Sequence, residues 1–152
     1  MGREWVPFLK EEIDELYQLL KSRVGDAYPD ELLYKLIDIV ESATFVEIDF
    51  GELMQCLEGC QSGYKILESQ EALNDYKAQN PGTINYMLAY RAYNIQNPQS
   101  SIENFALWAE DVEGLISEKG LLVLACSFTE GASSDFYLIS NNNNYSQVID
   151  KI

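Results

Sequence analysis

The side chains that could do chemistry in this chain are mainly carboxylates. Twenty-five Asp and Glu residues stand against ten Lys and Arg residues, and there is no histidine. Acyl transfer needs a base with a pKa near neutrality, and histidine is the commonest one. No Gly-x-Ser-x-Gly motif and no glycine-rich phosphate or dinucleotide loop occurs. Glycoside hydrolysis needs only a carboxylate pair, such as Glu47 with Asp49 or Glu110 with Asp111. Any acidic chain holds such pairs, so we expect a protein that is not an enzyme and needs no cofactor.

The carboxylates and the cysteines are also the side chains that could bind a metal ion. The segment from Glu47 to Glu52 has the acid density of a calcium loop but not its order of ligands. Three cysteines, Cys56, Cys60 and Cys126, are an odd number. Cys56 and Cys60 would share a helix face, but a metal needs two more ligands and no histidine can supply them. We therefore expect free, partly buried thiols and no metal site.

The uneven distribution of charge predicts a partner. The formal net charge is −15, which repels nucleic-acid backbones and anionic membranes. Two windows, one between Lys35 and Lys65 and one between Arg91 and Lys119, contain six and five acids and no basic residue. Windows that meet on one surface would attract a basic protein, although an acidic surface also serves solubility alone. The candidate partner-binding residues are Glu47, Asp49, Glu52, Trp108, Glu110, Asp111 and Glu113.

The elements that must position these residues begin with two helices. A helix is expected from Pro7 to Gly25, with one apolar stripe, and a second helix opens at Pro29. Residues 44–50 alternate between apolar and acidic side chains and predict a strand. Three elements are expected next: a short helix over 52–57 ending near Gly59, a strand over 64–67, and a helix over 69–78 with Ser69 as its N-cap.

The second half of the chain predicts further strands around one long helix. Residues 84–95 fit either a helix or a strand, and their aromatic residues favour the strand. Ser100 and Glu103 have capping-box spacing before a helix expected over 101–119 and closed by Gly120. Strands are expected over 121–128 and 136–139. After a turn at 141–144, Val148 and Ile152 are expected to pack back on the body.

Two residues of the predicted helix over 101–119 are ambiguous. At about 100° per residue, Glu113 projects into the same arc as Ile102 and Ala106. A carboxylate buried there without a partner is costly, so the helix loosens at Gly114, or Glu113 lies at the rim, or it meets Arg91 or a partner's cation. Trp108 is either a core residue or an interface anchor.

These elements predict a single α+β domain over residues 1–152, with helices packed on a mostly antiparallel sheet. No run of about 18 apolar residues occurs, and the N-terminus lacks the apolar region of a signal peptide. We therefore expect a cytoplasmic protein.

Four segments, in order along the chain, resemble the SUKH superfamily of immunity proteins. They are YPDELL at 28–33, GYKIL at 63–67 with Ser69, LLVLA at 121–125, and DFYLI at 135–139 after a loop with Gly131. Many bacterial members bind and neutralise toxin domains, often nucleases, so the resemblance implies an immunity protein that occludes a basic toxin. The alternatives are a DNA-mimic inhibitor of a nucleic-acid-binding enzyme, a small acidic immunity protein of another fold, and a carboxylate-dependent hydrolase.

Overall fold

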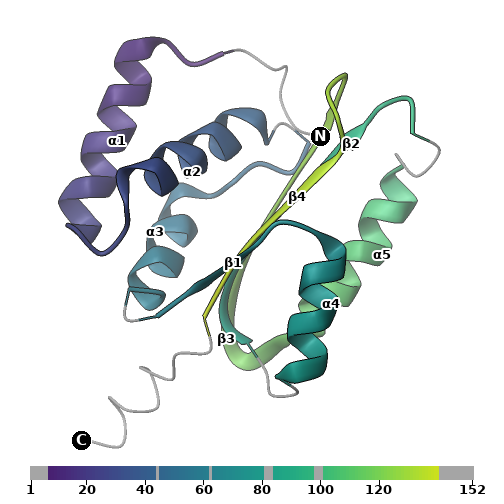
Figure 1. Ribbon diagram of the computed structural model, residues 1–152. Helices are drawn as coiled ribbons and strands as arrows, with labels where there is room; N and C mark the ends of the chain where they lie inside the picture. The colour runs from purple at the N-terminus through teal and green to yellow at the C-terminus, as the bar shows by residue number, and fades with distance from the viewer. Residues whose placement is uncertain (1–6, 44, 62, 81–83, 98–100, 141–152) are drawn as a thin grey trace, which may run out of the picture.

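The computed structural model describes residues 7–43, 45–61, 63–80, 84–97 and 101–140. Within these ranges the chain forms five helices and four strands (Figure 1). In chain order they are α1 (Lys10–Val24), α2 (Asp30–Ser42), α3 (Phe50–Gly59), β1 (Lys65–Leu67), α4 (Gln70–Gln79), β2 (Ile84–Asn94), α5 (Ile102–Glu113), β3 (Ile116–Thr129) and β4 (Ser134–Ser140). The α+β class is thereby confirmed.

The four strands form one mixed sheet in the order β1-β4-β2-β3. β4 runs antiparallel to both β1 and β2, whereas β2 and β3 are parallel. Parallel neighbours need a crossover connection, and α5 supplies it. Two of the three strand pairings are antiparallel, as the sequence led us to expect.

Helices cover both faces of this sheet (Figure 1). Successive side chains of a strand point to opposite faces. Leu88 and Tyr90 of β2 therefore pack in the cluster with α1, α2 and α3, whereas Met87 and Ala89 pack in the cluster with α4 and α5. The described residues thus form two apolar cores separated by the sheet, and α3 and α5 lie in different layers.

A turn at Gly25 follows α1 and leads to α2, and the sequence predicted the end of α1 at this glycine. Gly25 ends α1 with a φ of +58°, a conformation that glycine adopts without steric cost. Tyr28 follows, is almost fully buried, and donates its hydroxyl proton to the carbonyl oxygen of Leu57 in α3. The expected start of the first helix at Pro7 was early, because α1 begins at Lys10.

Residues 44–50 do not form the strand that their alternation predicted. Residue 44 lies outside the described residues. Among residues 45–50, Val46 forms a single antiparallel bridge to Cys126, and Phe50 already begins α3. The alternation is real, since Glu47 and Asp49 are exposed. Asp49, however, accepts a hydrogen bond from the backbone nitrogen of Glu52 at 3.1 Å and caps α3, so the helix begins before a strand can extend.

The helix expected over 101–119 was too long, because α5 ends at Glu113 and β3 begins at Ile116. The pairing of Ile84 with Ile116 is followed by Tyr86 with Leu121, so β3 bulges between these pairs. Gly120 lies in the bulge, where an added Cβ would be 2.9 Å from the carbonyl oxygen of Asn85. The glycine permits this close approach and does not cap a helix.

The helix caps are partly as expected. Ser69 accepts a hydrogen bond from the backbone nitrogen of Ala72 at 3.0 Å and caps α4, as predicted. The cap of α5 is Ser101, which accepts from the nitrogen of Asn104 at 3.0 Å. The predicted cap at Ser100 lies outside the described residues, as do the turn at 141–144 and the packing of Val148 and Ile152.

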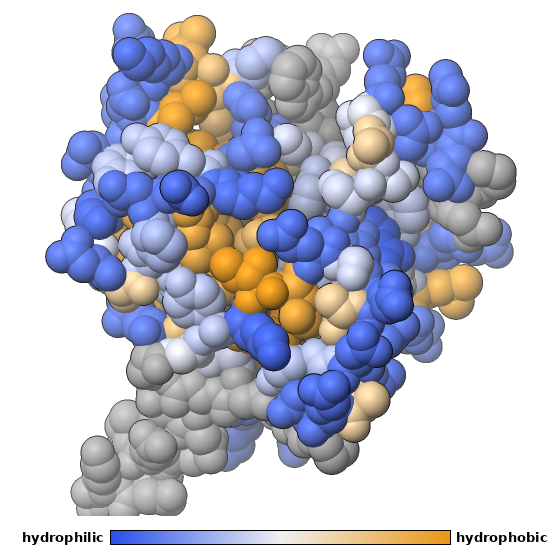
Figure 2. Space-filling view, in the orientation of Figure 1, coloured by the Kyte–Doolittle hydropathy of each residue, from blue (hydrophilic) through white to orange (hydrophobic). Residues whose placement is uncertain are grey.

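Hydrophilic residues cover much of the face shown in Figure 2, and apolar residues gather near its centre, in the area of β1 and β4. Among the described residues, no helix combines the length and the apolar character that crossing a membrane requires.

Candidate functional site

The site is built on the register between β2 and β4, which places Arg91 directly opposite Asp135. The guanidinium donates from Nε to Oδ1 of Asp135 at 2.8 Å and from Nη2 to Oδ2 at 2.7 Å. The two side chains are only 18% and 12% exposed. This is a bidentate, largely buried ion pair, the geometry in which an arginine–carboxylate contact is strongest.

Three further groups hold the guanidinium of Arg91 in place. Its Nη2 donates to Oε1 of Gln70 at 2.7 Å, and its Cζ lies 4.8 Å from the ring centroid of Trp108 and 5.7 Å from that of Tyr93. Burial lowers the pKa of Arg91 and is the largest single cause, but the contacts with Asp135, Tyr93 and Tyr137 together outweigh it, and the net shift is upward. Arg91 is therefore a permanent cation whose charge is neutralised by Asp135.

A hydrogen-bond chain continues from Asp135 through Tyr137 to α5. The hydroxyl of Tyr137 donates to Oδ2 of Asp135 at 2.8 Å and accepts from Nε1 of Trp108 at 3.0 Å. Burial is the main cause that raises the pKa of Tyr137, so the phenol stays protonated and can donate. Trp108, with 4% exposure, is thus a core residue that links α5 to the sheet.

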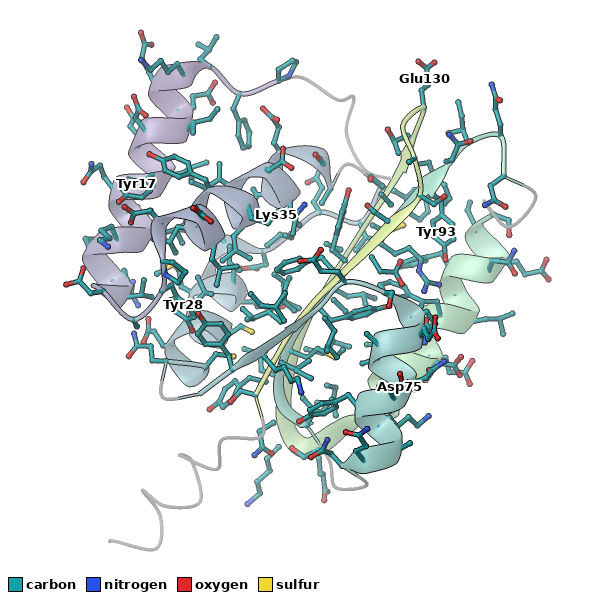
Figure 3. All side chains as sticks on the ribbon, viewed as in Figure 1. Tyr17, Tyr28, Lys35, Asp75, Tyr93 and Glu130 are labelled. Atoms are coloured by element: carbon teal, nitrogen blue, oxygen red, sulfur yellow. The ribbon has the colours of Figure 1, made fainter. Side chains whose placement is uncertain are left out.

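Above this network lies a surface pocket of about 260 Å³, which we call the Tyr93 pocket. It lies between α4, β2 and α5, and Figure 3 labels Tyr93 on the side of the sheet that faces α5. The hydroxyl of Tyr93 is buried and makes no hydrogen bond of good geometry among the described residues; burial raises its pKa, and the nearby guanidinium of Arg91 opposes that rise. The residues that line the pocket are Gln70, Arg91, Tyr93, Asn104, Trp108 and Asp111.

The outer face of α5 borders this pocket and combines acidic with apolar side chains. Ile102 and Leu107 are 55% and 58% exposed. The acids of α5 are all exposed, and the helix contains no basic residue: they are Glu103, Glu110, Asp111 and Glu113. This face therefore has both the charge that attracts a cationic surface and apolar contacts that can be desolvated.

Glu113 shares an arc of α5 with Ile102 and Ala106, as predicted, but this arc is not the buried one. The buried arc of α5 consists of Trp108, Ala109 and Val112, whereas Ile102 and Ala106 are exposed. The arc that faces the sheet is thus rotated towards Trp108 relative to the arc expected from the sequence. Glu113 consequently lies on the solvent side of the helix and faces no desolvation cost.

The other three predicted residues belong to a different part of the surface. Glu47, Asp49 and Glu52 are exposed, but Asp49 and Glu52 begin α3, which packs on the opposite face of the sheet from α5. The two acidic windows approach each other at Phe45, whose ring centroid lies 5.7 Å from that of Phe105 in α5. The seven predicted residues therefore form two separate groups.

Sequence reasoning missed most of the residues that build the pocket. Gln70, Tyr93, Asp135 and Tyr137 were not singled out, and Arg91 was considered only as a partner for Glu113. A period-two signal does exist, because Arg91 with Tyr93 and Asp135 with Tyr137 each place two functional side chains on one face of a strand. Only the strand register, however, shows that these two pairs meet.

The described residues contain no group of three or more side chains that would hold a metal ion. Cys56, Cys60 and Cys126 are free and buried. Burial raises the pKa of Cys126 to about 12, so its thiol is protonated at neutral pH.

Comparison with known proteins gives a likeness of fold alone. No family model matches the chain, and no curated protein matches it. The structure is similar to that of the FtsZ W319Y mutant from M. jannaschii, with a TM-score of 0.51 and 12% identity over 76% of this chain and 40% of that one. An FtsZ dimer structure from M. jannaschii is similar with a TM-score of 0.47 and 12% identity over 81% and 43% of the two chains. The chain thus spans less than half the length of both.

Proposed function

We propose that this protein is a non-enzymatic binding protein that captures a basic partner on the outer face of α5 and occludes it. The partner class that fits best is a nuclease-type toxin domain, which would make the chain an immunity protein. Such a domain presents a cationic surface because it must bind phosphates. Carboxylates placed on that surface would occupy the positions of the substrate's phosphates and keep the nucleic acid out.

The observation that carries this proposal is the composition of the α5 face. Four exposed acids without a basic residue on the same helix produce a local negative field, which speeds encounter with a cationic protein. Ile102 and Leu107 add what solubility alone does not require, namely aliphatic side chains more than half exposed among those acids. Apolar anchors surrounded by complementary charges are typical of interface centres and their rims.

The alternatives are less well supported by the geometry. A DNA mimic needs an extended array of carboxylates, whereas the two acidic windows lie on elements of opposite layers and Leu107 interrupts the α5 face. A glycoside hydrolase needs a pair of carboxyl groups about the scissile bond, whereas the described lining of the Tyr93 pocket includes one, that of Asp111.

The test compares two charge reversals of equal size. The double variant Glu110→Lys with Glu113→Lys alters the α5 face, and Asp14→Lys with Glu15→Lys alters the exposed side of α1. Each changes the net charge from −15 by +4 to −11. Immobilised full-length protein and both variants are incubated with extract of the native host at low and moderate salt, and the bound proteins are quantified by mass spectrometry.

We expect a basic protein to be retained by the unmodified chain and by the α1 variant but lost from the α5 variant. Retention should decrease between low and moderate salt, because exposed charges contribute mainly to association. Equal retention by the two variants, or the absence of any basic protein at either salt concentration, would contradict the proposal.

A further inference from the structure

The Tyr93 pocket contains a polar atom whose hydrogen bond is missing. Tyr93 is 5% exposed, and its hydroxyl has no partner among the described residues. A buried polar group without a partner typically costs about 1–3 kcal/mol, and such groups are uncommon in folded proteins. The hydroxyl therefore gains a hydrogen bond if a polar group enters the pocket and reaches it.

The lining of the pocket is rich in oxygen acceptors. Gln70, Asn104 and Asp111 line the pocket together with Tyr93, and Oε1 of Gln70 already accepts from Arg91 at 2.7 Å. The indole N–H of Trp108 is already used, because it donates to Tyr137 at 3.0 Å. The carboxylate of Asp111 accepts hydrogen bonds and donates none, so a group that brings N–H donors suits this lining.

The charges of the pocket select a cation. Arg91 is neutralised by Asp135 at 2.7 Å, so the remaining formal charge in the described part of the lining is the carboxylate of Asp111. The neighbouring residue Glu110 is exposed and acidic as well. An anion entering the pocket would be repelled by these carboxylates, whereas a cation would be attracted.

We propose that the Tyr93 pocket receives an arginine side chain of the partner protein, with its guanidinium paired to Asp111 and bonded to the hydroxyl of Tyr93. This inference rests on the proposed function, since it names the group of the basic partner that the site recognises. A guanidinium offers five donors in a planar fork. A cavity of about 150 Å³ already admits benzene, so a volume of about 260 Å³ holds the smaller planar cation.

The experiment uses small probes and does not need the partner. Full-length protein with ¹⁵N-labelled tryptophan is titrated with N-acetylarginine amide or with N-acetylcitrulline amide, a neutral analogue of the same shape. The readout is the NMR signal of the indole N–H of Trp108, a residue of the pocket lining. A Trp5→Phe variant removes the signal of the other tryptophan and assigns the two.

We expect the arginine probe to shift the Trp108 signal in a saturable manner and the citrulline probe to leave it unchanged. The variants Asp111→Asn and Tyr93→Phe should each weaken binding about tenfold, the loss expected when one hydrogen bond to a charged group is removed. The matched control Glu110→Gln, on the next residue but outside the lining, should weaken it less than threefold. The urea midpoint of Tyr93→Phe should be close to that of the unmodified protein, because the hydroxyl makes no hydrogen bond of good geometry in the described structure.

Three results would overturn the inference: no shift with the arginine probe, an equal shift with citrulline, or a Tyr93→Phe variant that loses stability while binding normally. These results are separate from a failure of the proposed function. If extract proteins depend on Glu110 and Glu113 while the arginine probe does not bind, the binding function stands and the pocket assignment fails. If the probe binds but no basic protein is captured, the function fails and the pocket keeps its specificity for a guanidinium.

Discussion

The ion pair between Arg91 and Asp135 gives the most direct test of what holds α4 and α5 on the sheet. Replacing Asp135 with alanine removes three hydrogen bonds: two from Arg91, at 2.8 and 2.7 Å, and one from Tyr137 at 2.8 Å. It also leaves the guanidinium without its counter-ion at a position where it is 18% exposed. Removing one partner of a buried pair costs about 3–5 kcal/mol.

For Asp135→Ala we expect a loss of stability near the lower end of the range of about 3–5 kcal/mol. The guanidinium keeps its hydrogen bond to Gln70 at 2.7 Å and its position over Trp108, and water can reach its exposed edge. We therefore expect Asp135→Ala to lower the free energy of unfolding by about 3 kcal/mol. With a urea m-value of about 2 kcal/mol per molar, the midpoint should fall by about 1.5 M.

Two variants complete this test. Asp75→Ala removes an exposed carboxylate of α4 on the same side of the sheet (Figure 3), and it should change stability by less than about 0.5 kcal/mol. The double variant Arg91→Met with Asp135→Leu removes both charges, and it should regain most of the loss because a buried pair can be replaced by apolar residues of similar volume. Circular dichroism and tryptophan fluorescence during urea unfolding measure all three. A loss below about 1 kcal/mol in Asp135→Ala would refute the assignment of a buried, structurally important pair.

Two further predictions concern the sheet. Gly120→Ala should lower the free energy of unfolding by about 1–3 kcal/mol, because the new methyl group would lie 2.9 Å from the carbonyl oxygen of Asn85; urea unfolding at an unchanged midpoint would show that the bulge is not tight. Stability should also fall above pH 9, because burial raises the pKa of Cys126 from 9.0 to about 12 and the pKa of Tyr137 is raised as well. Below pH 9 both states keep the thiol proton and the contribution is fully present; between pH 9 and about 12 the unfolded chain releases protons that the folded chain retains, so unfolding is favoured as pH rises. Urea midpoints at pH 8 and pH 10.5 measure this decrease, which should be smaller in Cys126→Ala, and a pH-independent midpoint would contradict it.

Local sequence signals correctly predicted several features that depend on neighbouring residues. The cap at Ser69 and the end of α1 at Gly25 follow from side-chain chemistry within a few positions. The aromatic residues of segment 84–94 favoured the strand over the helix that the apolar spacing also allowed. The alternation at residues 45–50 correctly showed which side chains are exposed. It could not show that the neighbouring strand β3 offers this segment one bridge, at Cys126, because the number of pairings depends on distant residues.

The end of α5 shows the same limit more clearly. Residues 116–119 contain Glu and Lys, which are good helix formers, and nothing local forbids a longer helix. Their strand conformation comes from pairing with β2, where Ile84 lies opposite Ile116. This contact spans 32 positions, and it overrides the local preference. The error in the buried arc of α5 had a related cause, because the sheet selects the face with Trp108 as the one to bury.

The sequence predicted the acidic residues of the candidate site but not the partners of Arg91, and the difference has a physical reason. Charge windows are visible in a sequence because they depend on composition, and the acids of α5 are exposed as a partner-binding face requires. The partners of Arg91 are not visible in this way. Asp135 lies 44 positions away, and only the antiparallel register of β2 with β4 brings the two side chains together.

The arrangement also separates the residues that stabilise the pocket from those that we propose bind its occupant. Asp135 and Tyr137 use their hydrogen-bonding capacity within the protein, so changing them should affect folding before it affects binding. Asp111 is exposed, and although the ring of Tyr93 packs against Arg91 and Phe128, its hydroxyl makes no hydrogen bond of good geometry in the described structure. Because Arg91 is neutralised from below by Asp135, it shapes the pocket without making it cationic. A protein with few basic residues can thus place one of them beneath an acidic surface and still present that surface to a basic partner.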